Sequence, residues 1–219
     1  MNHAPERPTL KLTPSLVSVV VIDPQVGFYS PAGTLGRKFG AEEFAPMRDV
    51  MQKLGAFLAQ LPQAATVIFV TSEYPYGLHT QGDQSDPLSL LCVPGMSDDC
   101  RIADEITMED QWTRIVKTSV DVFDNIDFSK KIEQSLSQER QAIIVCGFTL
   151  TTCIRRAVLG LCERRSGALP EILMLSDLVG ARLSTLKAED GQHSLAQAVI
   201  DELKSSGAVV LPSVQIQFE

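Results

Sequence analysis

The feature of this sequence that most restricts its fold is a series of short apolar runs separated by segments of helical pattern. Four runs are nearly continuous and rich in β-branched residues: 16–22, 65–70, 142–147 and 171–176. Two weaker candidates lie at 112–117 and 208–212, and helical patterns lie at 42–61, 129–138, 152–165 and 191–206. Continuous apolar runs are typical of parallel strands buried on both faces. Their alternation with helices predicts an α/β protein with a mainly parallel sheet.

The chain is long enough for one sizeable core, because 44% of its 219 residues are hydrophobic. We therefore predict a single domain over residues 1–219. Residues 72–111 interrupt the regular pattern and show little periodicity. Loops of this length in compact domains are usually functional or disordered. The tyrosines and leucines within this segment favour an ordered excursion.

Charge and apolar content limit the partners that this chain can have. A formal net charge of −8 and a pI near 4.9 argue against nucleic acid, because phosphate binding needs clustered Lys and Arg. The apolar run at 17–22 is too short for a membrane span or a secretory signal, so we expect a cytoplasmic protein without a membrane partner. The five cysteines are an odd number without framework spacing, which predicts reduced thiols. The expected partner is a small-molecule substrate.

Three reactive side chains follow or end predicted strands. Asp23 follows the first strand, Lys117 ends the strand at 112–117, and Cys153 follows the strand at 142–147. In an open parallel sheet, ligands bind at the carboxyl ends of the strands, where the strand order reverses. We therefore expect these three residues to lie on one edge of the sheet.

Cys153 stands at the predicted start of a helix, behind three threonines that could each act as N-cap. The helix dipole, the first-turn N–H groups and a nearby lysine would all favour the thiolate. A carboxylate nearby opposes the thiolate but can accept its proton. The same N–H groups could hold the oxyanion that forms when the sulfur attacks a carbonyl carbon. The pattern thus indicates a nucleophile with an adjacent oxyanion hole.

Four segments in the same order resemble motifs of the isochorismatase-like cysteine hydrolases. These segments are "VVVIDPQVGF", "VKTSVDVF", "VCGFTLTTCIRRAV" and "LMLSDLVGAR". The resemblance covers most of the chain. It implies a three-layer, Rossmann-like α/β/α fold with a six-stranded parallel sheet, and assembly as a homo-oligomer, either a dimer or a tetramer.

The resemblance also implies roles for the residues of a catalytic triad. Asp23 would act as general base and then acid, Lys117 would balance charge, and Cys153 would form a covalent intermediate that water resolves. The N–H groups of Leu150 and Cys153 would form the oxyanion hole. A cis peptide bond that the family has before the cysteine would fall at Thr149–Leu150. Asp177, at the end of a later strand, is expected to serve as a turn or capping residue.

Two departures from the family pattern narrow the expected chemistry. Metal-dependent nicotinamidases of the family carry Asp-Trp-His after the second strand, where this chain has Glu73-Tyr74-Pro75. We therefore expect no metal and no cofactor, and the turn "DPQVGF" lacks the glycines of a dinucleotide site. Isochorismate-cleaving members can lack the cysteine, so Cys153 favours hydrolysis of a C–N bond in an amide, ureido or carbamoyl group. Vinyl-ether hydrolysis and a non-catalytic, metabolite-binding role remain alternatives.

Several residues near the predicted triad are candidates for substrate binding. Phe28, Trp112, Phe148 and Leu150 could shape an apolar pocket, and Phe28 and Leu150 are preferred because they flank catalytic positions. Thr149 is a further candidate contact, and Trp112 could equally be a core residue. His79, in the excursion, is a candidate ligand contact.

Overall fold

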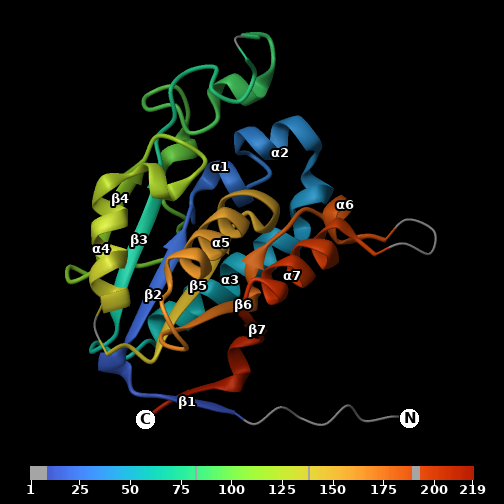
Figure 1. The fold of residues 1–219 in the computed structure, drawn as a ribbon. Coiled ribbons are helices and arrows are strands. Elements are labelled where there is room, and N and C mark those ends of the chain that lie inside the picture. Colours follow the sequence, from blue (N-terminus) through green and yellow to red (C-terminus); the bar gives the residue numbers. More distant parts are fainter. Residues whose placement is uncertain (1–8, 82, 138, 189–192) are drawn as a thin grey trace.

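A computed structural model of the protein describes residues 9–81, 83–137, 139–188 and 193–219. A six-stranded parallel sheet with the order β4-β3-β2-β5-β6-β7 forms its centre (Figure 1). The strands are β2 (Val17–Ile22), β3 (Thr66–Ser72), β4 (Thr113–Lys117), β5 (Ala142–Phe148), β6 (Glu171–Gly180) and β7 (Val209–Leu211). The chain builds the sheet outward from β2 in one direction and then returns to place β5 on the other side of β2. The predicted α/β fold is confirmed, including both weaker strands.

Helices cover both faces of this sheet. They are α1 (Val26–Tyr29), α2 (Thr34–Phe39), α3 (Ala45–Ala59), α4 (Ile126–Ser137), α5 (Arg155–Arg164), α6 (Leu183–Leu186) and α7 (Leu195–Ser205). One hydrophobic core contains the buried side chains of α3, and the other contains those of α4, α5 and α7. The molecule therefore has three layers, with α3 behind the sheet and α5 and α7 in front in Figure 1.

The sequence of β2 explains why its apolar run is continuous rather than alternating. Val19 and Val21 belong to the core on the α3 side, whereas Val20 and Ile22 belong to the core on the α5 side. Successive side chains of a strand point to opposite faces, so a central strand covered on both sides needs an apolar residue at nearly every position. The exception in β2 is Ser18, whose buried hydroxyl bonds that of Ser135. All six residues of β2 are buried.

Three of the four predicted helices are shorter in the structure, whereas α4 begins three residues earlier than predicted. Two of the boundaries have clear local causes. The segment predicted at 42–61 divides into a 3-10 turn (Ala41–Phe44) and α3, which has Pro46 in its first turn. At α7, Ser194 accepts a hydrogen bond of 3.1 Å from the N–H of Gln197 and so fixes the start of that helix. Residues 138 and 191–192, which the predictions placed in helices, lie outside the described residues.

A second, two-stranded parallel sheet joins the two ends of the described chain. It pairs β1 (Leu10–Leu12) with β8 (Ile216–Phe218), and Lys11 and Glu219 form an ion pair of 2.5 Å beside it. Sequence analysis missed both strands because three residues are too few to show a periodic pattern. Among the described residues, no helix is long and apolar enough to cross a membrane.

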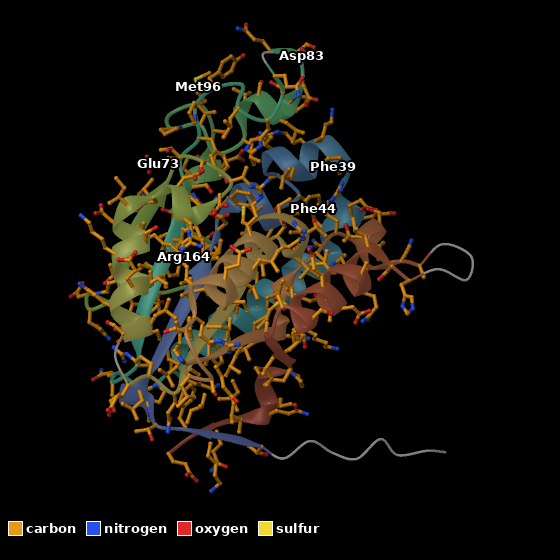
Figure 2. The ribbon with its side chains drawn as sticks, viewed as in Figure 1. Phe39, Phe44, Glu73, Asp83, Met96 and Arg164 are labelled. Carbon is orange, nitrogen blue, oxygen red and sulfur yellow. The ribbon has the colours of Figure 1, made fainter. Side chains whose placement is uncertain are left out.

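The excursion after β3 is folded onto the carboxyl edge of the sheet. It contains two short 3-10 turns, Pro87–Leu90 and Asp98–Cys100. The buried Asp99 ties it to α2, because its Oδ1 accepts a hydrogen bond of 3.0 Å from the N–H of Thr34. Figure 2 shows Glu73 near the base of the excursion, with Asp83 and Met96 near its outer end. The expected ordered excursion is thus present in the described residues, and it forms one wall above the sheet.

Candidate active site

The structure brings Asp23, Lys117 and Cys153 together at the carboxyl edge of the sheet. Nζ of Lys117 lies 3.1 Å from Oδ2 of Asp23 and donates a hydrogen bond of 3.5 Å to Sγ of Cys153. The side chains of Asp23 and Lys117 are both 0% exposed. A buried ion pair is costly unless further hydrogen bonds satisfy its charges. Such a pair is therefore weak evidence for stability and stronger evidence for a functional site.

Asp23 is held by Ser72 of β3 and, through Ser72, by Gln25. Its Oδ1 accepts a hydrogen bond of 2.7 Å from the hydroxyl of Ser72, the last residue of β3. Ser72 is fixed in turn by Gln25, whose side-chain amide accepts from the N–H of Ser72 at 2.6 Å and donates to its carbonyl at 3.0 Å. Oδ2 of Asp23 has the ion pair with Lys117 but no well-aligned hydrogen bond among the described residues. This oxygen can therefore receive a proton.

The backbone of Asp23 turns the chain away from the sheet. Its φ is 52°, in the left-handed region that aspartate tolerates better than most residues. Its N–H still pairs with the carbonyl of Val70 on β3 at 2.9 Å, and its own carbonyl accepts from the N–H of Gln25 at 2.8 Å. The Asp-Pro-Gln sequence thus ends β2 and directs the carboxylate towards Lys117.

Lys117 has two hydrogen-bond partners that sequence analysis did not identify, the carbonyl of Ser119 at 3.3 Å and the hydroxyl of Tyr74. Its Nζ donates a hydrogen bond of 2.6 Å to the hydroxyl of Tyr74, and that hydroxyl lies 3.9 Å from Sγ of Cys153. Burial would lower the pKa of Lys117, but Asp23 and Cys153 more than reverse this effect, so its pKa is raised. The position of Tyr74, two residues after β3 on the same edge, was the signal that could have identified it.

Cys153 lies in a π-helical turn, Leu150–Ile154, that joins β5 to α5. The sequence predicted an ordinary helix start with a threonine N-cap, but Thr149 takes the N-cap position without a side-chain cap and bonds the hydroxyl of Thr152 instead. The non-proline cis peptide lies at Phe148–Thr149, one residue earlier than expected at Thr149–Leu150.

The thiol of Cys153 is less acidic than the sequence predicted. Its side chain is buried, and burial is the main reason that its pKa is raised to about 11. Asp23 raises the pKa further, whereas Lys117 lowers it. The expected bias towards thiolate is therefore wrong for the unliganded site. At neutral pH the sulfur carries its proton and needs a base.

The predicted oxyanion donors, the N–H groups of Leu150 and Cys153, both lie in the first turn of this helix. The first four N–H groups of a helix have no intrahelical acceptor in regular geometry. Two N–H groups of the turn are engaged, because those of Thr152 and Ile154 donate to the carbonyl of Thr149 at 3.2 Å.

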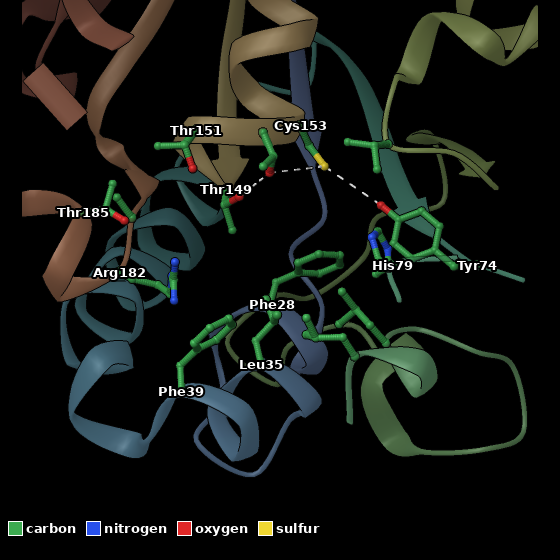
Figure 3. Close-up of a pocket in the computed structure, with 15 residues that line it drawn as sticks. Phe28, Leu35, Phe39, Tyr74, His79, Thr149, Thr151, Cys153, Arg182 and Thr185 are labelled. Carbon is green, nitrogen blue, oxygen red and sulfur yellow. Dashed lines mark hydrogen bonds between the residues drawn. The ribbon is translucent and has the colours of Figure 1, made fainter. Parts of the chain in front are cut away.

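A pocket of about 280 Å³ opens onto Cys153 (Figure 3). Apolar side chains from α1, α2 and the excursion line it, together with four threonines and two basic residues. The full lining is Phe28, Leu35, Phe39, Tyr74, His79, Leu88, Leu91, Val120, Thr149, Thr151, Thr152, Cys153, Ala181, Arg182 and Thr185. Phe28, Thr149 and His79 are thus in the positions that sequence analysis expected. Leu35, Phe39, Arg182 and Thr185 were missed, because their distance along the chain gives no sign of this proximity.

Phe148, Trp112 and Leu150, three predicted pocket residues, do not line this pocket. Phe148 is fully buried in the core, where its ring lies 6.4 Å from that of Tyr29. Trp112 stacks on Phe69 with a centroid distance of 6.0 Å, in the core on the α3 side. The second interpretation of Trp112, as a core residue, is the one that holds.

His79 packs against the residues around Lys117. Its ring contacts Tyr74 edge to face at 4.7 Å, and its Nε2 is buried without a hydrogen-bond partner among the described residues. Burial and the charge of Lys117 lower the pKa of His79. The imidazole is therefore neutral at pH 7, and it offers the pocket one nitrogen that can accept or donate a hydrogen bond.

The segment Glu73-Tyr74-Pro75 has other contacts in place of metal ligands. Glu73 pairs with Arg114 at 3.9 Å, and Tyr74 bonds Lys117. Within the part of the chain that the structure describes, no three His, Cys, Asp or Glu side chains gather so that they could hold a metal ion.

Asp177 has a structural role away from the triad. It lies within β6, which continues past it to Gly180 rather than ending there as expected. Its carboxylate accepts hydrogen bonds from the N–H and the hydroxyl of Ser213, at 2.7 and 2.6 Å. These bonds fix the turn after β7, as expected of a turn residue.

Fold and site together define a three-layer α/β protein with a buried Asp-Lys-Cys cluster at the switch point of its sheet. The family model described as "Isochorismatase domain" matches residues 17–213. The chain therefore belongs to the isochorismatase family, and it is a hydrolase. A comparison with curated proteins finds no significant match.

Solved structures with the same fold include several hydrolases. PnC1 from L. infantum, in complex with nicotinate, has a TM-score of 0.71 and 16% identity over 96% of this chain and 99% of its own. A cysteine hydrolase from Pseudomonas syringae pv. phaseolicola 1448A has a TM-score of 0.64 and 18% identity over 98% of this chain and 96% of its own. N-carbamoylsarcosine amidase from Thermoplasma acidophilum has a TM-score of 0.60 and 17% identity over 90% of this chain and 96% of its own. At these identities, the likeness is one of fold.

Proposed function

We propose that this protein is a cysteine hydrolase that cleaves a C–N bond in an amide, ureido or carbamoyl group of a small molecule. The observation that carries this proposal is the ammonium of Lys117, which contacts both the Asp23 carboxylate and the Cys153 sulfur at one end of a pocket. The similar fold of an N-carbamoylsarcosine amidase, whose name states action on a C–N bond, supports the same reaction class.

The first half of the reaction forms the covalent intermediate. Because the thiol of Cys153 has a pKa of about 11, Asp23 acts as the base and takes its proton on Oδ2. The sulfur attacks the carbonyl carbon, and the oxyanion is held by the N–H groups of Leu150 and Cys153. Asp23 then gives its proton to the leaving nitrogen, and the C–N bond breaks to leave a thioester.

Water completes the reaction in the second half. Asp23, ionised again, takes a proton from the water that attacks the thioester carbon. The tetrahedral intermediate collapses, the C–S bond breaks, and the proton returns to the sulfur. Lys117 stays positively charged throughout, because Asp23 and Cys153 raise its pKa, and it stabilises whichever of these neighbours is anionic.

The experiment that tests this proposal is a screen of amides, ureido compounds and carbamoyl compounds for ammonia release. With a compound that is turned over, Cys153→Ala, Asp23→Asn and Lys117→Met are each expected to abolish turnover while circular dichroism shows an intact fold. Cys162→Ala is the matched control, because this half-buried cysteine lies on α5 and does not line the pocket. Mass spectrometry of the quenched wild type should show an acyl adduct on Cys153.

Turnover that persists in Cys153→Ala would reject the covalent mechanism and favour vinyl-ether hydrolysis. Ligand-induced stabilisation without any product would favour a metabolite-binding role.

A further inference from the structure

Arg182 is the charged residue that lines the pocket, and no carboxylate of the described residues forms an ion pair with it. It follows β6 at the carboxyl edge, and it is the one Asp, Glu, Lys or Arg among the described residues that line the pocket. Its guanidinium makes no ion pair or hydrogen bond within the described residues, and it lies over the ring of Phe39, 4.0 Å from the ring centre. In a chain of net charge −8, a basic group left free at a pocket wall indicates a ligand of opposite charge.

The surroundings of Arg182 hold its side chain in place without occupying its donors. Phe39 covers one face of the planar guanidinium, so the N–H edge stays free. The nearby carboxylate of Glu43 accepts hydrogen bonds on Oε2 from the N–H and the hydroxyl of Ser184, at 3.0 and 2.5 Å. These bonds and the charge of Arg182 lower the pKa of Glu43, so the two side chains attract each other without forming an ion pair. An arginine with a fixed plane and a free edge suits bidentate binding of a carboxylate.

Two hydroxyl groups lie on the same side of the pocket. Thr151 and Thr185 line it beside Arg182, across from Tyr74 and His79 (Figure 3). Neither hydroxyl forms a hydrogen bond among the described residues, whereas those of Thr149 and Thr152 bond each other at 2.5 Å. We name Arg182, Thr151 and Thr185 the arginine end of the pocket. Its donors are available for an anionic group.

We propose that the arginine end binds a carboxylate of the substrate while Cys153 attacks a carbonyl carbon elsewhere in the same molecule. The inference rests on the proposed function and narrows its substrates to small amides, ureido or carbamoyl compounds that carry one carboxylate. A single guanidinium balances one negative charge. A phosphate dianion would keep an unbalanced charge beside the apolar walls that Phe28, Leu35 and Leu91 form.

The test measures equilibrium binding in a Cys153→Ala background, where no turnover occurs. The probes are N-acetylglycine, N-acetyl-β-alanine and N-acetyl-4-aminobutyrate, each compared with its own neutral carboxamide by isothermal titration calorimetry. The three lengths sample the spacing between the two ends of the pocket. At least one carboxylate should bind tenfold or more tightly than its amide, and Arg182→Gln should remove this preference. Arg182→Lys, which keeps the positive charge but loses the paired N–H donors of the guanidinium, should retain part of the preference for the carboxylate.

Arg48→Gln is the matched control, because it removes the same charge from an exposed site on α3 and should leave the preference intact. Equal binding of carboxylates and amides in the Cys153→Ala protein would overturn the inference, as would a preference that survives Arg182→Gln. Inorganic phosphate that competes as well as the best carboxylate would overturn the choice of carboxylate. Because binding needs no nucleophile, a preference without turnover in the wild type would count against the hydrolase proposal alone.

Discussion

Lys117 donates a hydrogen bond of 2.6 Å to the hydroxyl of Tyr74, and its ammonium also lies 4.8 Å from the centre of the Tyr74 ring. Both side chains are buried, so water cannot replace this bond. The hydroxyl reaches towards Cys153 as well. Tyr74 therefore belongs to the buried cluster of charged and reactive groups rather than only to the pocket wall.

We predict that Tyr74→Phe removes the shortest of the hydrogen bonds that the buried ammonium of Lys117 donates and destabilises the protein by about 1–3 kcal/mol. The same change should lower kcat/KM by at least about tenfold, because the ammonium of Lys117 then shifts its position relative to the Asp23 carboxylate and the Cys153 sulfur. Tyr29→Phe is the matched control, because it also removes a half-buried tyrosine hydroxyl, whose hydrogen bond of 2.9 Å goes to Glu105 and not to Lys117. Urea unfolding and steady-state kinetics of the two variants separate the effects. Equal activity losses in both would show that Tyr74 contributes through stability alone.

The pH dependence of alkylation should reveal the acidity of Cys153. The thiol, not the thiolate, is the form present below a pKa of about 11, and iodoacetamide reacts with the thiolate. The labelling rate of Cys153 in the unliganded protein should thus rise about tenfold per pH unit from pH 7 and level off only near pH 11. Peptide mapping by mass spectrometry assigns the label to each cysteine. A plateau below pH 9 would contradict the raised pKa.

Asp23→Asn should have opposite effects on the reactivity of Cys153 and on turnover. The carboxylate raises the pKa of the thiol, so its loss lowers that pKa and increases the thiolate fraction at any pH below it. A nearby charge shifts a pKa by about 1–3 units, so labelling at pH 8 should be at least about tenfold faster. Turnover should nevertheless be abolished, because no group then carries the proton to the leaving nitrogen. Glu73→Gln removes a charge outside the Asp23-Lys117-Cys153 cluster, so neither the labelling rate of Cys153 nor the turnover rate should change. Slower labelling in Asp23→Asn would mean that Asp23 acts as base in that reaction too.

Much of the fold follows from the sequence, because β2 and β5 are buried on both faces and need an apolar residue at nearly every position. The shared position of Asp23 and Lys117 at the carboxyl edge of the sheet follows from the parallel direction of the strands alone. Tyr74 could have been found in the same way, because it follows β3 at this edge. The contact of Arg182 with Phe39 of α2 could not, since only packing in three dimensions brings these two residues together. The acidity of Cys153 was mispredicted for a related reason, because local helix geometry is visible in sequence and the depth of burial is not.

Gly147 permits the close approach of β5 to β2 immediately before the cysteine turn. Its φ is 115°, and a Cβ at this position would lie 2.0 Å from the carbonyl oxygen of Ile22. Gly147→Ala should therefore cost about 3 kcal/mol or more in the free energy of unfolding, since both backbone strain and a backbone clash oppose it. Gly167→Ala is the control, because that glycine also has positive φ, 90°, but open space around it. It should cost only about 1–2 kcal/mol, the strain term alone. Urea unfolding that gives equal costs for the two variants would show that β5 moves away from Ile22 without penalty.

Ser72 is expected to position Asp23 rather than to react. Ser72→Ala removes the 2.7 Å hydrogen bond to Oδ1 of Asp23 and lets the carboxylate turn about its side-chain bonds. Because proton transfer depends on the orientation of Oδ2 towards the sulfur, kcat should fall about tenfold while KM changes little. Ser18→Ala is a matched control in the same sheet, where the buried hydroxyl of Ser18 bonds that of Ser135 at 3.2 Å. Both variants should lose similar stability in urea unfolding, yet only Ser72→Ala should slow turnover, and Ser72→Thr, which restores a hydroxyl, should recover part of the rate. A rate that falls equally in Ser18→Ala would assign the loss to the sheet as a whole and not to the carboxylate.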